Sequence, residues 1–372
     1  MKTTVLSKIF AAAFLAVAVL SCTPIGTDTS EEDEDKTENP ANPANPENPE
    51  NPANPENPGS PGESEDPGDS DEQEPPVVQD CLIRTISMTG TLNVSVDFSA
   101  EALSSSRLYV ALPYPAENRY QDISDIRTDG KLMTAKRGDA YLAWYESFSS
   151  GSKVSRECEI TFDYVTYSVS TDFSKITEIY PYDTSSDIYK NHTSSSGSYI
   201  VPSNSTIKTI ASSIWEESAD ELDYARKCYE YVAENYRYLN PNTGIHTLQQ
   251  NLRDGGGDCG NLSAIYISLL RNKKIPSRPV VCIRPDASFH VWSEFYLEAY
   301  GWIPVDVTYK NSDPRGDYFG TYPGDCIVVS NEYDLDMVIG NEDFDVPLLQ
   351  TYAYWYWNMS GMKESYSIKK VK

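Results

Sequence analysis

Hydrophobic and polar residues alternate in the first part of the chain that has any regular pattern. In GTLNVSVDFS, the residues Leu92, Val94 and Val96 fall on one face, which is typical of a strand with one buried side. Two further segments, RLYVALPYP and ECEITFDYVTYSVS, are rich in β-branched and aromatic residues. We therefore predict a β-sandwich-like N-terminal domain at residues 81–200.

After residue 200 the period becomes that of helices. TIKTIASSIW and the segment that begins at Glu221 each carry an apolar stripe, and Ser218 with Glu221 fits a capping box. A third helix is expected to start at the end of GGGDCGN (255–261) and to end near Asn272. Its apolar residues recur at i, i+3, i+4, i+7 and i+8: Leu262, Ile265, Tyr266, Leu269 and Leu270.

Three segments with strand character follow this helix. They are RPVVCIR (278–284), FHVWSEFYL (289–297) and WIPVDVT (302–308). Helices followed by consecutive strands indicate an α+β fold, with an antiparallel sheet packed against a central helix. We expect this second domain to cover residues 201–372.

The start of the chain has the features of an exported lipoprotein. An apolar run, IFAAAFLAVAVL, follows Lys2 and Lys8; it is too short to span a bilayer but suits a signal peptide. The run ends in VLSC, which resembles a bacterial lipobox. We therefore expect residues 1–21 to be removed and Cys22 to be lipidated. The protein would then be lipid-anchored to the bacterial cell envelope, most readily at the outer membrane.

Residues 22–80 are expected to form a disordered, Pro-rich, acidic tether. Seven Asn-Pro pairs favour polyproline II, and the segment has too little apolar surface to fold. It carries 18 acidic residues and one basic residue, so residues 81–372 keep 38 acidic and 27 basic residues, a net charge of −11. This negative charge argues against nucleic acid as a partner.

Six cysteines remain after the lipidation site: Cys81, Cys158, Cys228, Cys259, Cys282 and Cys326. Their irregular spacing does not indicate a disulfide framework, and the chain has no CxxC pair for a zinc ribbon. Cys228 lies beside a helical stripe and is best interpreted as a buried small residue. We expect no metal ion or other cofactor.

Cys259 stands where a helix is predicted to begin, with Asp258 as the N-cap. The unpaired N–H groups and the dipole of a helix N-terminus favour an anion, and the thiolate is the nucleophilic form of cysteine. The preceding glycines allow a close approach of the backbone to a substrate. Taken alone, the motif fits an inert cysteine in a glycine-rich turn equally well.

His290 and Asp306 supply the partners that a nucleophilic cysteine needs. A thiolate needs an imidazole, and the imidazole needs an acceptor that fixes its orientation. The three side chains can meet only if His290 and Asp306 share a sheet face. This requires a hairpin register in which paired residue numbers add to an even total. Glu294, on the face of His290, could hold a positive group near the cleft, but by default it is an exposed strand carboxylate.

The motifs GDCGN, IPSR, HVWSE and WIPVDVT together resemble those of the transglutaminase-like superfamily of papain-type thiol enzymes. The resemblance implies a papain/transglutaminase-like core, with a β-rich domain in front of it. It also implies that Cys259 is the nucleophile, that His290 is the base and later the acid, and that Asp306 orients the imidazole.

The neighbours of this triad are less well defined by the sequence. Trp292 either walls the active site or belongs to the core. The backbone N–H of Cys259 should be one oxyanion donor. Gln249, Gln250 and Asn251 are the candidates for a second donor, with Gln250 and Asn251 favoured for substrate binding.

The implied activity is a cell-surface thiol hydrolase, a peptidase or amidase that works through a thioester acyl-enzyme. Its substrate would be a peptide, a protein or a small amide. Two alternatives remain open. The same triad could serve a protein-crosslinking acyl transferase, or it could be a relic in a lipoprotein that only binds a glycan or peptide.

Overall fold

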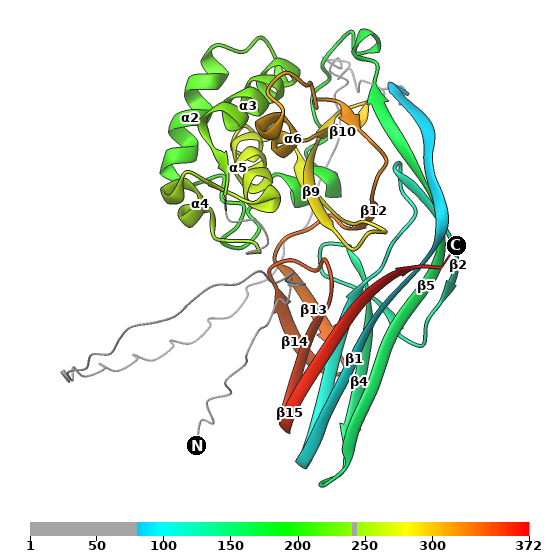
Figure 1. The fold of residues 1–372 in the computed structure, drawn as a ribbon. Coiled ribbons are helices and arrows are strands. Elements are labelled where there is room, and N and C mark those ends of the chain that lie inside the picture. Colours follow the sequence, from blue (N-terminus) through cyan, green and yellow to red (C-terminus); the bar gives the residue numbers. More distant parts are fainter. Residues whose placement is uncertain (1–79, 240–243, 372) are drawn as a thin grey trace, which may run out of the picture. The chain divides into compact units, whose positions relative to one another are not determined.

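The computed structural model describes residues 80–239 and 244–371 (Figure 1). The signal peptide (1–21), the lipidation site Cys22 and nearly all of the tether (22–80) lie outside the described residues, so these remain predictions. Among the described residues, no helix combines the length and the apolar character that a membrane span requires.

A seven-stranded antiparallel sheet surrounds one long central strand, β1. Its strands are β1 (Leu82–Pro113), β2 (Gln121–Arg127), β3 (Lys131–Thr134), β4 (Ala140–Phe148), β5 (Lys153–Thr171), β11 (Thr321–Tyr322) and β15 (Ala353–Lys370). Along one edge, β1 pairs first with β5 and then with β4, and its other edge pairs with β15. Register shifts between residues 99 and 107 mark bulges, which bend β1 and curl the sheet.

The expected β-rich N-terminal region is confirmed, but its limits and form differ from the prediction. We expected two sheets within 81–200 and a separate domain over 201–372. Instead, β15 pairs with β1, so the last strand belongs to the first sheet. Alternation within a strand cannot reveal which distant segment will cover its free edge. A hairpin of β13 (Leu335–Ile339) and β14 (Glu342–Val346) packs its apolar side chains against one face of this sheet. Within the described part of the chain, this hairpin is the second β-layer that resembles the expected sandwich.

The helical core and a second sheet occupy the middle of the chain. The described residues contain α1 (Asp187–His192), α2 (Ser205–Glu216), α3 (Glu221–Asn235), α4 (Leu248–Asp254), α5 (Cys259–Asn272) and α6 (Val307–Ser312), with a short 3-10 turn (Phe173–Lys175). Four antiparallel strands are ordered β10 (Gly301–Val305), β9 (Phe289–Leu297), β8 (Ser277–Ile283) and β12 (Ile327–Ser330). Two short strands, β6 (Arg237–Tyr238) and β7 (Gly256–Gly257), pair in parallel.

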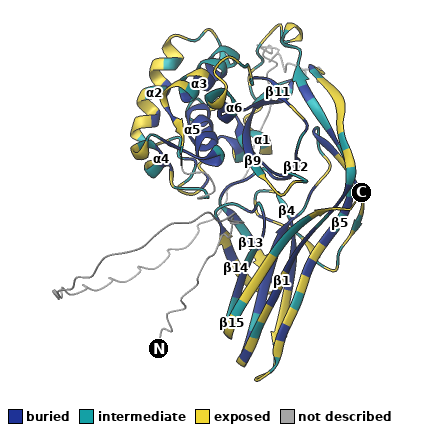
Figure 2. Ribbon diagram, in the orientation of Figure 1, coloured by how far each residue is buried: buried dark blue, intermediate teal, exposed yellow. Residues whose placement is uncertain are grey.

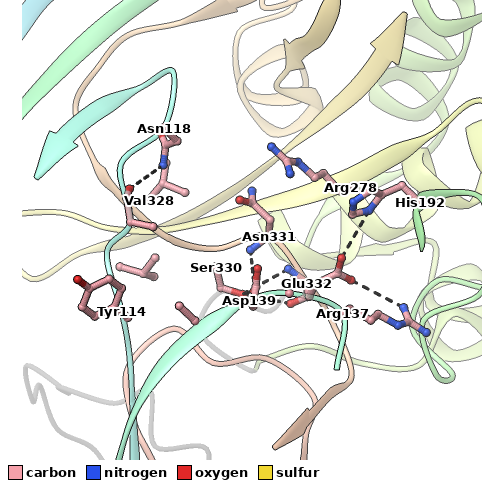
Figure 3. A pocket seen from close by; sticks show the side chains of 14 residues that line it. Tyr114, Asn118, Arg137, Asp139, His192, Arg278, Val328, Ser330, Asn331 and Glu332 are labelled. Carbon is pink, nitrogen blue, oxygen red and sulfur yellow. Dashed lines mark hydrogen bonds and ion pairs between the residues drawn. The ribbon is translucent and has the colours of Figure 1, made fainter. Parts of the chain in front are cut away.

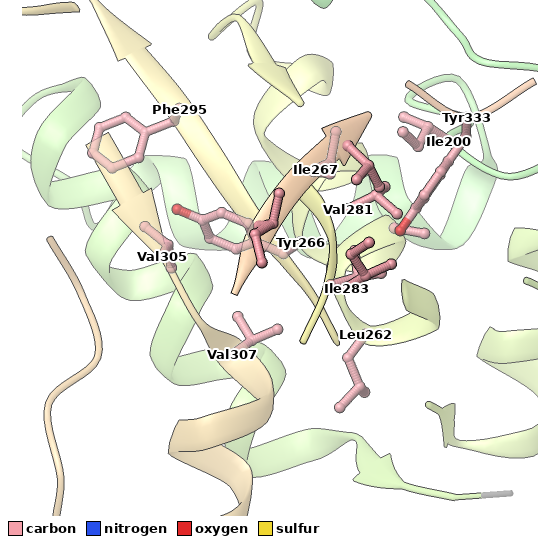
Figure 4. Packing of buried hydrophobic residues seen from close by; sticks show 14 of the residues in the cluster. Ile200, Leu262, Tyr266, Ile267, Val281, Ile283, Phe295, Val305, Val307 and Tyr333 are labelled. Atoms are coloured by element: carbon pink, nitrogen blue, oxygen red, sulfur yellow. The ribbon is translucent and has the colours of Figure 1, made fainter. Parts of the chain in front are cut away.

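Helix α5 is the centre of this core. Every residue from Gly260 to Arg271 is buried (Figure 2), because α2, α3 and α4 contact the helix together with β8 and β9. Figure 4 shows apolar side chains of α5, among them Leu262 and Tyr266, in one cluster with Val281 and Phe295 of the sheet. The predicted α+β core, a central helix against an antiparallel sheet, is confirmed.

The observed end of α5 and start of α3 can be compared with the predicted ones. Helix α5 ends at Asn272 as predicted. The capping box at the start of α3 was wrong: Asp220 is the N-cap and accepts a hydrogen bond from the backbone N–H of Asp223 at 2.8 Å. The hydroxyl of Ser218 instead donates to the carbonyl oxygen of Ile214, at the end of the preceding helix, at 2.7 Å.

Candidate active site

The glycines before Cys259 allow two very close backbone approaches. A Cβ added at Gly256 would lie 2.0 Å from the carbonyl oxygen of Arg237, and the φ of Gly256 is +144°. A Cβ added at Gly257 would lie 2.4 Å from the Cβ of Asn261, within the first turn of α5. Only glycine fits at these positions, and the tight contact fixes where α5 begins.

Cys259 is the first residue of α5, and Asp258 is the N-cap, as predicted. The Asp258 carboxylate accepts hydrogen bonds from the backbone N–H groups of Asn261, at 3.2 Å, and of Gly260. The backbone N–H of Cys259 is therefore not used by this cap. The thiol is half-buried. It lies in the first turn of α5, and its own N–H can donate to a substrate oxygen.

The Asn261 side chain joins three segments around the start of α5. Its Oδ1 accepts from the backbone N–H of His246 at 2.8 Å and from Nδ2 of Asn251 at 3.0 Å. Its Nδ2 donates to the carbonyl oxygen of Gly244 at 3.0 Å and to Asp258 at 2.8 Å. Asn251 is fully buried in this network, so its amide is not available as the oxyanion donor that we expected.

The hairpin register that the triad requires is confirmed. Strands β9 and β10 pair Val305 with Ser293, and this even-sum register continues toward Asp306. As a result, Nε2 of His290 lies 2.5 Å from Oδ2 of Asp306, and both residues are buried.

The strand predicted over 302–308 ends earlier than expected. It stops at Val305, and α6 begins at Val307. The reason is the second role of Asp306, whose Oδ1 accepts the backbone N–H of Tyr309 at 2.9 Å and caps the helix. One carboxylate therefore holds the imidazole with one oxygen and a helix N-terminus with the other.

The electrostatics of His290 favour the imidazolium. Burial alone would lower the pKa of His290, but the charge and hydrogen bond of Asp306, followed by those of Cys259, raise that pKa well above its ordinary value. Since Nε2 is bonded to Asp306, the interaction with Cys259 falls to Nδ1. The structure thus brings together Cys259, His290 and Asp306, as the sequence predicted.

A cavity of about 650 Å³ lies beside His290. Its walls include Tyr238, Arg284 and Tyr309 from the core, and Met88 and Lys370 from the curled sheet. The sheet therefore lines part of a cavity that contains His290; Cys259 is not among the residues that line it.

Trp292 and Gln250 do not occupy the places expected for substrate-binding residues. Trp292 is only 1% exposed, and its ring packs between Tyr120 and Tyr322 with ring centroids 5.7 and 4.5 Å apart. It therefore belongs to the core. The side chain of Gln250 makes no hydrogen bond to Cys259 or His290 among the described residues.

Glu294 is fully buried, contrary to the exposed position expected by default. One carboxylate oxygen accepts a hydrogen bond from Nε of Arg278 at 2.8 Å, and the other accepts one from the hydroxyl of Tyr120. The Arg278 guanidinium lies over the ring of Trp302, at 4.1 Å from its centroid. These contacts join the segment after β1 to the core sheet, so the role of Glu294 is structural.

Two residues near the imidazole were missed by the sequence analysis. Nε2 of Gln350 donates to the carbonyl oxygens of His290, at 3.0 Å, and Cys282, at 2.8 Å. The ring of Tyr309 stacks on that of His290. Gln350 lies 60 residues from His290, outside every motif, and nothing in the sequence could identify it. Tyr309 follows Asp306 by one helical turn, and a predicted helix there would have drawn attention to it.

A second, polar cavity of about 280 Å³ contains a buried carboxylate (Figure 3). Glu332 is 2% exposed and lies between His192 and Arg137, with its oxygens 3.5 and 3.7 Å from their nitrogens. Neither oxygen has a hydrogen bond among the described residues. Burial raises the pKa of Glu332 to about 7.

Comparison with known proteins agrees with this geometry. Residues 208–307 match the family model described as the transglutaminase-like superfamily, and the matched segment contains Cys259, His290 and Asp306. No curated protein sequence matches the chain.

Two solved structures were compared. A crystal structure described as a “Putative Cysteine Protease” from Cytophaga hutchinsonii aligns with a TM-score of 0.53 and 13% identity, covering 78% of this chain and 93% of that one. The periplasmic domain of TgpA from Pseudomonas aeruginosa aligns with a TM-score of 0.31 and 13% identity, covering 58% and 93%. The first likeness extends over most of the chain and shows a common fold.

Proposed function

Residues 208–307 form a transglutaminase-like domain, and from this premise we propose that the chain is a thiol hydrolase that cleaves peptide or amide bonds. The observation that carries the proposal is the convergence of three side chains from three elements. Cys259 begins α5, His290 lies on β9 and Asp306 follows β10. An inert cysteine would not need an imidazole that is itself held by a buried carboxylate.

In the proposed cycle, the Cys259 thiolate attacks the carbonyl carbon of an amide, and the backbone N–H of Cys259 donates to the developing oxyanion. The C–N bond breaks when Nδ1 of His290 gives its proton to the leaving amine, and a thioester remains. His290 then takes a proton from water, which attacks the thioester carbonyl carbon; the C–S bond breaks, the Cys259 thiolate leaves, and the carboxylic acid product ionises. Asp306 keeps the imidazole oriented throughout.

Water and amines can both resolve the thioester, so hydrolysis and crosslinking share every step up to that point. We favour hydrolysis. The structure from Cytophaga hutchinsonii that has the same fold, described as a “Putative Cysteine Protease”, supports this choice. The cavity beside His290, of about 650 Å³, falls in the range of volumes that ligand pockets have.

The test is thiol-dependent acyl transfer by the purified chain. A library of fluorogenic peptides is incubated with and without a primary amine, and the products are identified by mass spectrometry. We expect cleavage that is lost in Cys259→Ala and retained in Cys158→Ala, a buried cysteine of the curled sheet. Amine adducts in place of cleavage would favour the crosslinking transferase. No acyl transfer of either kind would favour the binding protein.

We also propose that the mature chain is held at the cell envelope by a lipid on Cys22, with residues 22–80 as a tether. The support is the lipobox-like VLSC and the acidic, Pro-rich segment that follows it. Metabolic labelling with a fatty acid should mark the parent chain but not Cys22→Ala. In cell fractionation, Cys22→Ala should no longer be found with the membranes. An unchanged distribution of Cys22→Ala would contradict the anchor.

A further inference from the structure

The Tyr309 ring lies parallel to the His290 imidazole. The two ring centroids are 4.8 Å apart, and the planes differ by 13°. Trp292 is also roughly parallel to the imidazole, but its centroid is 6.1 Å away, at the outer limit of the distance at which a cation over an aromatic face gains appreciable energy. Of these two rings, Tyr309 is therefore the better placed to act on the charge of His290.

Tyr309 is held in this position from both ends. Its backbone N–H donates to Oδ1 of Asp306 at 2.9 Å. Its hydroxyl accepts a hydrogen bond from Nη2 of Arg284 at 2.7 Å, and Nε of Arg284 is bonded to Asp325 at 3.0 Å. The ring is thus fixed against the imidazole without any contribution from a substrate.

We propose that Tyr309 is a positioning residue whose ring stabilises the imidazolium form of His290. The inference deepens the proposed function and rests on it, since the imidazolium is the partner of the Cys259 thiolate. The face of an aromatic ring carries negative electrostatic potential and attracts a cation that stacks on it. The attraction is absent when the imidazole is neutral, so the ring favours the charged form.

The charged and titratable groups around His290 determine at which pH removal of the Tyr309 ring should have an effect. Asp306 bonds to its Nε2, Cys259 faces Nδ1, and Arg284 and Asp325 lie behind Tyr309. Despite its burial, the pKa of His290 is raised well above its ordinary value by Asp306 and then by Cys259, so the imidazolium loses its proton on the alkaline side. The Tyr309 ring should therefore affect the alkaline transition.

The experiment compares Tyr309→Leu, which removes the ring, with Tyr309→Phe, which keeps the ring and loses only the hydroxyl. Both variants keep the backbone N–H that bonds to Asp306. The rate of Cys259 alkylation by iodoacetamide is measured from pH 4 to 10. We expect the alkaline midpoint to fall by about 0.5–1 pH unit in Tyr309→Leu and to stay within about 0.2 unit in Tyr309→Phe. The acid midpoint should be unchanged in both.

A second measurement separates this inference from the proposed activity. In a Cys259→Ala background, the midpoint of the His290 imidazole titration is followed by NMR, where only three histidines need to be resolved. The same fall is expected with Tyr309→Leu. Equal midpoints for the parent and Tyr309→Leu would overturn the inference, as would an equal fall in Tyr309→Phe, which would assign the effect to the hydroxyl. If the parent thiol proves unreactive, the proposed function fails while the NMR comparison still decides the role of Tyr309.

Discussion

Nε2 of His290 lies 2.5 Å from Oδ2 of Asp306, and 16 residues of chain separate the two. The contact depends on the β9–β10 register and on the end of β10 at Val305, which leaves Asp306 as both the acceptor of the imidazole and the cap of α6. Replacing the charge without removing the cap isolates the first of these roles.

In Asp306→Asn, the amide oxygen can still accept the backbone N–H of Tyr309, so the fold should be kept. Burial of His290 is then opposed by Cys259 but no longer by Asp306, and the pKa of the imidazole should fall. We expect the alkaline limb of Cys259 alkylation to move down by about 1–3 pH units, with a loss of activity at pH 7. An alkaline limb in the same place as in the parent would show that Asp306 does not set the charge of His290.

Gly256→Ala should disrupt the start of α5. The new Cβ would meet the carbonyl oxygen of Arg237, a backbone atom that cannot move away, and the φ of +144° is unfavourable for alanine. We expect a loss of at least about 2 kcal/mol in the free energy of unfolding, measured by urea denaturation. The control is Gly255→Asn, at a φ of +75° with no atom within 4 Å of the added Cβ. It should cost less than about 1 kcal/mol, because asparagine tolerates this conformation. Equal losses would contradict the steric explanation.

Asn261→Asp should destabilise the chain more than the loss of hydrogen bonds alone. The new carboxylate cannot donate to Gly244 or Asp258, and it would place a charge in a fully buried position next to Asp258. We expect a loss of about 3 kcal/mol or more at pH 7 in urea denaturation, and faster proteolysis around residues 244–261. The control Asn341→Asp, at an exposed position between β13 and β14, should change stability by less than about 0.5 kcal/mol. A similarly small loss of stability in Asn261→Asp would mean that the hydrogen bonds of the Asn261 side chain are not needed for the stability of the fold.

Glu332→Gln should make stability less dependent on pH. In the unfolded chain Glu332 loses its proton near pH 4.3, whereas in the folded chain burial raises its pKa to about 7. The folded state binds the extra proton between these values, so this group reduces stability as pH rises through them. The unfolding free energy of Glu332→Gln, relative to the parent, should therefore increase by up to about 3 kcal/mol from pH 5 to pH 8.

The matched control for that measurement is Glu234→Gln, an exposed glutamate of α3. Its stability relative to the parent should be the same at pH 5 and pH 8. If Glu332→Gln also shows no pH dependence, the carboxylate must be hydrated or paired more closely than the distances to His192 and Arg137 indicate.

Sequence patterns correctly predicted the elements whose limits depend on interactions between residues close in the sequence. Asp258 and the apolar spacing after it gave the correct start and end of α5, and the strand character of FHVWSEFYL gave the limits of β9. The predicted meeting of Cys259, His290 and Asp306 depended only on these elements and on the parity of one register.

Contacts between distant segments were not predictable in the same way. Val307 and Thr308 favour strands by composition, but the bonds of Asp306 to both His290 and the N–H of Tyr309 start a helix there. Glu294 reads as an exposed strand residue until Arg278 and Tyr120 are known to contact it. The amide of Asn251 was a candidate for binding an oxyanion only while its bond to Asn261 was unknown.

The pairing of β1 with β15 sets the order in which the molecule can assemble. Leu92 lies opposite Lys370, so one edge of the first long strand gains its neighbour only after Lys370 has been synthesised. Until then the edge offers unsatisfied N–H and C=O groups to any other strand, and the closure spans a distance in sequence that slows folding. Misassembly during biogenesis is therefore concentrated in the sheet, which also lines the cavity beside His290 through Met88 and Lys370, while the core around α5 can form from contacts that are closer in sequence.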